Sequence, residues 1–124
     1  MPRRTALASG SALRSFALSL PEVEEIETWD IPTFRVRRKM IAIMADDEAT
    51  ASIKASVDEQ QALVKADPQT YSFAPYVGRH GWVLCQLTQI PIVVLEELLT
   101  EAWRATAPKR LVRAWDTSQL RDGH

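Results

Sequence analysis

Apolar side chains at helical spacing predict one helix near each end of the chain. The first covers residues 5–20 and stops at Pro21, because its apolar positions follow i, i+3, i+4, i+7 spacing: Leu13, Phe16, Ala17 and Leu20. The second accepts Pro91 in its first turn and ends before Pro108. Its inward positions are Ile92, Leu95, Leu98, Leu99, Ala102, Trp103 and Thr106. Each helix therefore presents one apolar stripe to a core.

Strand-type patterns fill the stretch from residue 24 to residue 55. Alternation and β-branched residues predict strands over residues 24–29, 33–36, 39–44 and 50–55. The breaks between them are Ile31-Pro32, a tight turn at Arg37-Arg38, and an acidic turn at Asp46-Asp47-Glu48. Because such short turns join successive strands, we expect antiparallel pairing.

A capping box starts a helix in the middle of the chain. The Ser56 hydroxyl can accept from the backbone N–H of Glu59, whose carboxylate reaches back to the start of the helix. The helix runs to about Ala66 and buries Ala62 and Leu63, with Ala66 as a third candidate.

The most unusual stretch is Ala74–Val83, which contains two aromatic residues, two glycines, an arginine and a histidine. It lies between a predicted extended segment over residues 71–77, interrupted at Pro75, and a strand over residues 82–87. The turn is predicted at Gly78-Arg79-His80-Gly81, where glycine permits a sharp bend or a close backbone approach.

These elements follow the order α-β-β-β(-β)-α-β-β-α, which is typical of the α+β class. We predict an antiparallel sheet of five to six strands flanked by helices, with the helices on one face. Residues 1–112 form a single domain, and residues 113–124 form a C-terminal tail whose last part, from Asp116 on, is frayed.

Composition restricts the class of protein further. The net charge of -1 argues against a strongly electrostatic nucleic-acid binder, and the only cysteine, Cys85, favours a reducing, cytoplasmic compartment. We expect no signal peptide and no membrane-spanning segment, because no long apolar run occurs. No phosphate loop or dinucleotide fingerprint is present, so no cofactor is predicted.

Charge is arranged in blocks along the chain. Five acids lie between Glu22 and Asp30 without a base, four bases lie in residues 35–39, and four more bases lie between Arg104 and Arg113 without an acid. Such blocks predict either a basic side and an acidic side of the surface or a set of solvated turns.

The sequence contains few candidate catalytic or metal-binding residues. Cys85 lies in an apolar strand and is interpreted as a buried core residue, and His80 is interpreted as a turn residue. A metal site would need three or four converging ligands, which the sequence does not supply. Iron binding by the acids from Glu22 to Glu27 is disfavoured, because strand alternation divides them between two faces. We predict a protein that is not an enzyme and holds no metal.

Five segments together resemble the MmcQ/YjbR family over about residues 10–112. They are Trp29-Asp30-Ile31-Pro32-Thr33-Phe34-Arg35-Val36, Lys39-Met40, Ala51-Ser52-Ile53-Lys54, Ala74-Pro75-Tyr76-Val77-Gly78-Arg79-His80-Gly81-Trp82-Val83, and Ala102-Trp103 through Leu111. The resemblance implies a CyaY-like fold and DNA binding in a double-wing mode. The chain departs from the family at Asp30, where members carry glycine, and at Arg37-Arg38, where members have a glycine-containing turn.

Two functional hypotheses follow. In the first, the chain binds DNA through basic hairpin wings and phosphate contacts. Its candidate cations are Arg35, Arg37, Arg38, Lys39, Lys54, Arg79, His80 and Lys109, and the candidate ligand or base-stacking residues are Trp29, Thr33, Tyr76 and Trp82.

In the second hypothesis, the chain is a binding module for an anionic small molecule or an acidic protein partner. Trp29, Thr33, Arg35, Lys54, Tyr76, Arg79 and His80 then line a groove. Two structural interpretations remain open beside both hypotheses. Trp29 and Trp82 can belong to the core, and Arg35 and Lys54 can pair with Glu25 or Glu27 across the sheet.

Overall fold

A six-stranded antiparallel sheet forms the centre of the molecule. The computed structural model describes residues 6–45, 47–75 and 77–122, and the strand order is β1-β2-β3-β4-β6-β5. The strands are β1 (Val23–Thr28), β2 (Ile31–Val36), β3 (Lys39–Met44), β4 (Thr50–Ile53), β5 (Tyr71–Phe73) and β6 (Val83–Gln86). The predicted α+β class and the antiparallel sheet are confirmed.

The register divides the sheet into a buried face and an open face. Phe34, Ala42, Ile53 and Val83 pair across four strands, and each is at most 2% exposed. A bulge in the β2–β3 ladder, between Phe34 and Arg35, leaves Ile41 without a partner, so Ile41 and Ala42 are both fully buried. The neighbouring row, which includes Thr33 and Ser52, lies on the opposite face.

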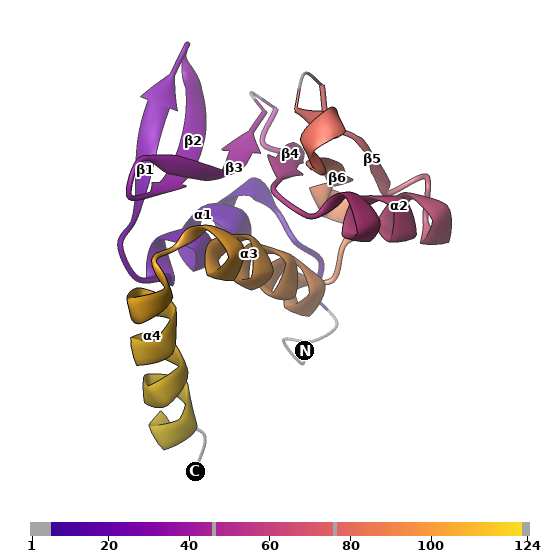
Figure 1. Ribbon diagram of the computed structural model, residues 1–124. Coiled ribbons are helices and arrows are strands. Elements are labelled where there is room, and N and C mark those ends of the chain that lie inside the picture. The colour runs from indigo at the N-terminus through magenta and orange to yellow at the C-terminus, as the bar shows by residue number, and fades with distance from the viewer. Residues whose placement is uncertain (1–5, 46, 76, 123–124) are drawn as a thin grey trace.

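Four helices accompany the sheet (Figure 1). They are α1 (Gly10–Ser19), α2 (Val57–Ala66), α3 (Ile92–Thr106) and α4 (Lys109–Asp122), with short 3₁₀ turns η2 (Gly78–His80) and η3 (Leu87–Gln89). α1 and α3 cover the buried face, α2 packs near the β5 edge, and α4 extends away from the body. None of the helices in the described part of the chain combines the length and apolarity that a bilayer crossing requires.

The N-terminal helix is shorter than the apolar spacing predicts. Ser9 caps α1 by accepting from the Ala12 N–H at 3.0 Å, so the helix begins at Gly10. The preceding residues 6–8 are extended and pair with residues 90–92, where the Ala8 N–H donates to the Ile90 carbonyl at 2.7 Å. This pairing supplies backbone partners that a longer helix would have provided internally.

The first hairpin turns two residues earlier than predicted. Trp29 and Asp30 both have positive φ and form the turn, whereas Ile31 and Pro32 belong to β2 and do not break the strand. Pro32 is tolerated because it pairs with Glu27 near the strand's start, before the ladder with β3 begins at the next residue. The predicted strand over residues 50–55 likewise ends at residue 53.

The capping box at Ser56 is confirmed, and Leu63 packs against the core as predicted, but the other two predicted inward positions of α2 are wrong. Ala62 and Ala66 are exposed, and the buried position is the polar Gln60, which is 3% exposed. Its side-chain amide donates to the carbonyls of Gly78 at 2.6 Å and Trp82 at 2.7 Å. Hydrophobic spacing could not predict this position, because the partners are backbone groups from a distant segment.

The end of the chain also differs from the predicted frayed tail. Residues 109–122 form α4, which crosses the expected boundary at residue 112. Trp115 packs on the fully buried Trp103 with ring centroids 5.3 Å apart, and Asp116 forms an ion pair with Arg104. These contacts with α3 stabilise a helix in a segment whose polar composition suggested a tail.

At the start of α3, Pro91 is the N-cap and not a first-turn residue.

We expect Gln60→Leu to lower the free energy of unfolding by about 2–3 kcal/mol, because two buried carbonyls lose their donor. Gln61→Leu, on the exposed neighbour, is the control and should change stability little. Urea unfolding of both variants measures the difference. Equal stability of the two variants would show that the Gln60 amide does not hold the η2 segment.

Candidate functional site

The β2–β3 turn carries three consecutive cations at one end of the sheet. Arg37 and Arg38 both adopt positive φ, 51° and 73°, as in the two-residue turns that usually contain Asn-Gly. The Arg37 guanidinium forms an ion pair with Glu22. Hydrogen bonding to Arg37 lowers the pKa of Glu22, which keeps this carboxylate ionised. Arg38 and Lys39 are exposed.

The start of α4 brings two more cations to this end. The Trp103 indole N–H donates to the Pro21 carbonyl at 3.0 Å, which joins the end of α3 to the turn before β1. Arg110 lies close enough to Glu22 for its charge to lower the pKa of that carboxyl group. We call this set of exposed cations the basic corner; its members are Arg37, Arg38, Lys39, Lys109 and Arg110.

The sequence shows Arg110 beside Lys109 among the cations that follow the last predicted helix, but it does not show what Arg110 faces. The block of four bases between Arg104 and Arg113 was a usable signal, but the block alone did not indicate which bases face the β2–β3 turn. Which bases face the turn depends on the hydrogen bond from Trp103 to Pro21, because it joins residues 82 positions apart in the chain.

The β1–β2 turn, at the other end of β2 from the basic corner, carries acidic and aromatic side chains. Trp29, at the tip of the β1–β2 turn, is 89% exposed, so the core interpretation of this residue is wrong. Its neighbours Asp30 and Glu27 are exposed carboxylates. Since β2 rises about 3.3 Å per residue, Trp29 and Arg38 lie roughly 20 Å apart. They cannot line a single small pocket.

Arg35 is held by neutral groups on the open face of the sheet. Its guanidinium donates to the hydroxyls of Thr33 at 3.1 Å and Thr28 at 3.1 Å, and to the Arg38 carbonyl at 3.1 Å. Thr33 is 3% exposed and donates to the Ile26 carbonyl at 2.6 Å. The predicted site residues Thr33 and Arg35 thus form one network between β1 and β2, near the basic corner's turn.

The alternative of a charge ladder across the sheet is not what the structure contains. Glu25 pairs with Arg14 of α1 at 2.8 Å, and the ion pairs within the described residues do not join Arg35 or Lys54 to Glu25 or Glu27.

Lys54 is directed to the end of α3. Its ammonium donates to the Thr106 hydroxyl at 2.9 Å, at the C-terminal turn where the helix dipole is negative. The hydrogen bond to Thr106 accounts for the orientation of the Lys54 side chain, so no ligand is needed to explain it.

Arg79 and His80 lie on η2, between the two strands at the β5 edge, and so belong to a different part of the sheet from the basic corner. Arg79 donates to the His80 ring at 3.3 Å. Gly81 has φ of 101°, and a Cβ there would lie 2.4 Å from the Ala55 carbonyl oxygen. The close approach predicted for this glycine is therefore present.

Trp82 is 7% exposed, which favours the core interpretation over base stacking. Tyr76 lies outside the described residues. Arg79 borders a cavity of about 470 Å³. The other lining residues are Val57, Gln60, Phe73, Ala74 and Gly78.

Cys85 is fully buried, and burial raises the pKa of its thiol to about 12. Within the described ranges, no group of three or more His, Cys, Asp or Glu side chains converges to hold a metal ion.

Comparison with known proteins identifies the family. A sequence model of the YjbR family matches residues 18–105, so the chain belongs to the YjbR family. Uncharacterized proteins of Mycobacterium bovis and Mycobacterium tuberculosis are 43% identical over 54 residues. That stretch covers 44% of this chain and 42% of each relative, so the alignment spans less than half of their length.

A crystal structure of a Deinococcus radiodurans protein, described as a DUF419 domain, shares the fold with a TM-score of 0.72 and 25% sequence identity. The match covers 81% of this chain and 79% of that one. DUF419 is a YjbR/MmcQ-like domain, which agrees with the resemblance stated above.

The Arg37-Arg38 turn yields a prediction about stability. Replacing it with Asn-Gly (R37N/R38G) should raise the melting temperature by about 3 °C, because these residues adopt positive φ at lower cost than arginine. Thermal unfolding monitored by circular dichroism measures the change. A lower melting temperature would mean that the Arg37–Glu22 ion pair outweighs the backbone strain.

Burial of Cys85 yields a second prediction. At pH 8 the native thiol should react with a disulfide reagent at least about a hundredfold more slowly than in the denatured chain, because the thiolate is scarce and shielded. Absorbance of the released thiolate measures both rates. Comparable rates in native and denatured protein would contradict the buried assignment.

Proposed function

We propose that this protein binds DNA through the basic corner, without sequence preference and with moderate affinity. The supporting observation is that Arg37 and Arg110, from two distant segments, both lie near the carboxylate of Glu22. Their chain neighbours Arg38, Lys39 and Lys109 are exposed. Cations gathered on one surface release counterions from the phosphate backbone and supply affinity even when the net charge of the protein is near zero.

The proposed interface keeps only one of the two predicted wings. The β2–β3 turn is the wing that contacts phosphate, and the second group of phosphate contacts comes from the start of α4 and not from the η2 hairpin. Lys54 and Arg35 act as supports of this surface, through Thr106 and through the Arg38 carbonyl. Arg79 and His80 are not part of the proposed interface.

We propose further that the protein acts by binding and is not an enzyme. Its only thiol is protonated and buried, and the His80 ring accepts a hydrogen bond from Arg79, so neither group is prepared for nucleophilic or general-base chemistry.

A titration with fluorescent duplex DNA tests the proposal. Binding should be measurable at about 20 mM salt and should weaken steeply by about 200 mM salt. R37N/R38G should bind at least about fivefold more weakly and reduce the slope of log affinity against log salt by about 1–2. Because that variant is expected to be more stable than the parent, weaker binding cannot be assigned to unfolding.

Matched variants distinguish DNA binding by the basic corner from an effect of the protein's net charge on DNA affinity. K109Q/R110Q should weaken binding as R37N/R38G does, whereas K65Q/R121Q removes the same charge from other surfaces and should leave affinity within about twofold. Equal losses in both pairs would refute the basic corner, and absence of binding at low salt would refute DNA binding altogether.

A second candidate function rests on Arg79. This cation borders the cavity beside η2, so a small anionic ligand is the alternative occupant. Binding of a small carboxylate or phosphate that Arg79→Gln abolishes, with DNA binding unchanged or absent, would favour this alternative.

A further inference from the structure

Trp29, at the tip of the β1–β2 turn, is the most exposed large apolar side chain among the described residues. Its side chain is 89% exposed, and its backbone adopts φ of 53°, a conformation that bulky residues rarely take. Asparagine or glycine would form this two-residue turn at lower cost. The chain therefore holds an aromatic ring in solvent on a strained turn, an arrangement typical of residues that bind a partner.

The cavity beside η2 offers an apolar surface that could receive such a ring. Phe73 and Val57 line it and are 59% and 45% exposed, so part of their apolar surface is uncovered. The volume of about 470 Å³ is large enough to admit an indole. Among the described lining residues, Arg79 carries the only charge.

Charge complements this apolar fit. Asp30 follows Trp29 in the turn, and both Asp30 and Arg79 are exposed. The ion pairs among the described residues include neither of these two side chains. An indole seated in the cavity brings the carboxylate of Asp30 toward the guanidinium of Arg79, which also stacks favourably on an aromatic face.

The Trp29 turn and the cavity beside η2 lie at opposite sides of one chain. The turn joins the first two strands in the order β1-β2-β3-β4-β6-β5, whereas η2 leads into β6 next to the β5 edge (Figure 1). The turn therefore does not fill the cavity of its own chain. A two-fold axis between two copies makes two identical contacts, because each copy supplies one turn and one cavity.

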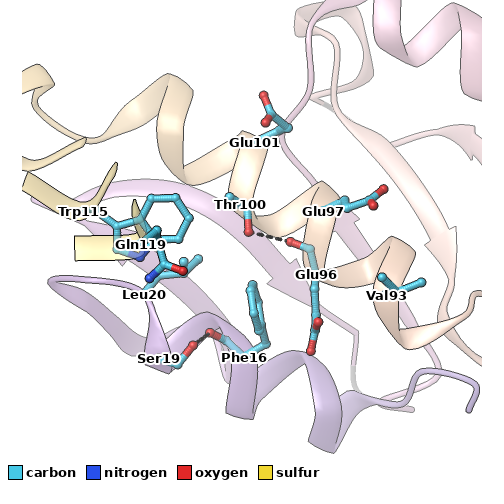
Figure 2. Close-up of a pocket in the computed structure, with 10 residues that line it drawn as sticks. All are labelled: Phe16, Ser19, Leu20, Val93, Glu96, Glu97, Thr100, Glu101, Trp115 and Gln119. Atoms are coloured by element: carbon cyan, nitrogen blue, oxygen red, sulfur yellow. Dashed lines mark hydrogen bonds between the residues drawn. The ribbon is translucent and has the colours of Figure 1, made fainter. Parts of the chain in front are cut away.

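The other cavity of the molecule does not suit the same turn. It lies between α1, α3 and α4 (Figure 2). Its charged lining residues are Glu96, Glu97 and Glu101, which would repel the carboxylate of Asp30. Charge therefore favours the cavity beside η2.

We infer that this protein forms a reciprocal dimer in which the Trp29 turn of each copy inserts into the cavity beside η2 of the other copy. Asp30 of one copy then pairs with Arg79 of the other. The occupant of the cavity is thus a side chain of a second copy and not a free small anion. Two tryptophan contacts bury less than the roughly 1,200 Å² of a stable interface, so we expect a weak dimer with Kd of about 1–100 µM.

Sedimentation velocity of the full chain from about 5 to about 500 µM tests the inference, and the protein should change from monomer to dimer over this range. Trp29→Gly should weaken dimerisation at least about tenfold and raise the melting temperature, because glycine adopts positive φ without strain. Loss of the dimer then cannot be assigned to unfolding. Leu120→Ala removes another exposed apolar side chain, on α4, and should leave the dimer Kd within about twofold.

Charge reversal tests the pairing of Asp30 with Arg79. D30K and R79E should each weaken dimerisation at least about tenfold, and the double variant D30K/R79E should restore Kd to within about threefold, because opposite charges face each other again. D30K leaves the cavity intact. Inorganic phosphate bound by D30K as well as by the parent, alongside loss of the dimer, separates this contact from binding of a free anion at Arg79.

Three results would overturn the inference: a monomer at every concentration, equal losses in Trp29→Gly and Leu120→Ala, or a double variant that stays as weak as D30K and R79E. Because the DNA experiment alters residues outside the turn and the cavity, failure of either proposal leaves the other standing.

Discussion

The indole of Trp103 is the contact on which the arrangement of the surface depends. The side chain is fully buried on α3, donates to the Pro21 carbonyl ahead of β1, and packs against Trp115 of α4. One residue thereby fixes where the sheet edge, the long helix and the last helix meet. The basic corner and the cavity between the helices both follow from that junction, because each contains residues from α4 and from a neighbouring element.

The surface is divided by charge although the net charge is only -1. Cations gather at the β2–β3 turn and the start of α4, whereas carboxylates lie at the opposite hairpin tip and along α3. A near-neutral protein can present local fields of both signs, since screening limits each field to about 10 Å.

Periodicity predicted most of the fold, because helices and strands reflect local alternation of apolar residues. The long helix before Pro108 was found this way, whereas the Ser56 capping box came from a local side-chain motif and the Arg37-Arg38 turn from the break between two strand patterns. It failed at Gln60, where burial is compensated by carbonyls 18 and 22 residues away. It failed again for α4, whose polar composition hides the stabilising contact of Trp115.

For the candidate site, the sequence alone determined the supply of cations, since charge blocks and turn positions depend only on the order of residues. It also determined that Cys85 lies in an apolar strand. Only the tertiary structure decided which cations act together: Arg110 joins the β2–β3 turn, Lys54 serves α3, and Arg79 lies at another edge. The reason is physical, because electrostatic cooperation depends on distance through space, and that distance is set by contacts between residues far apart in the chain.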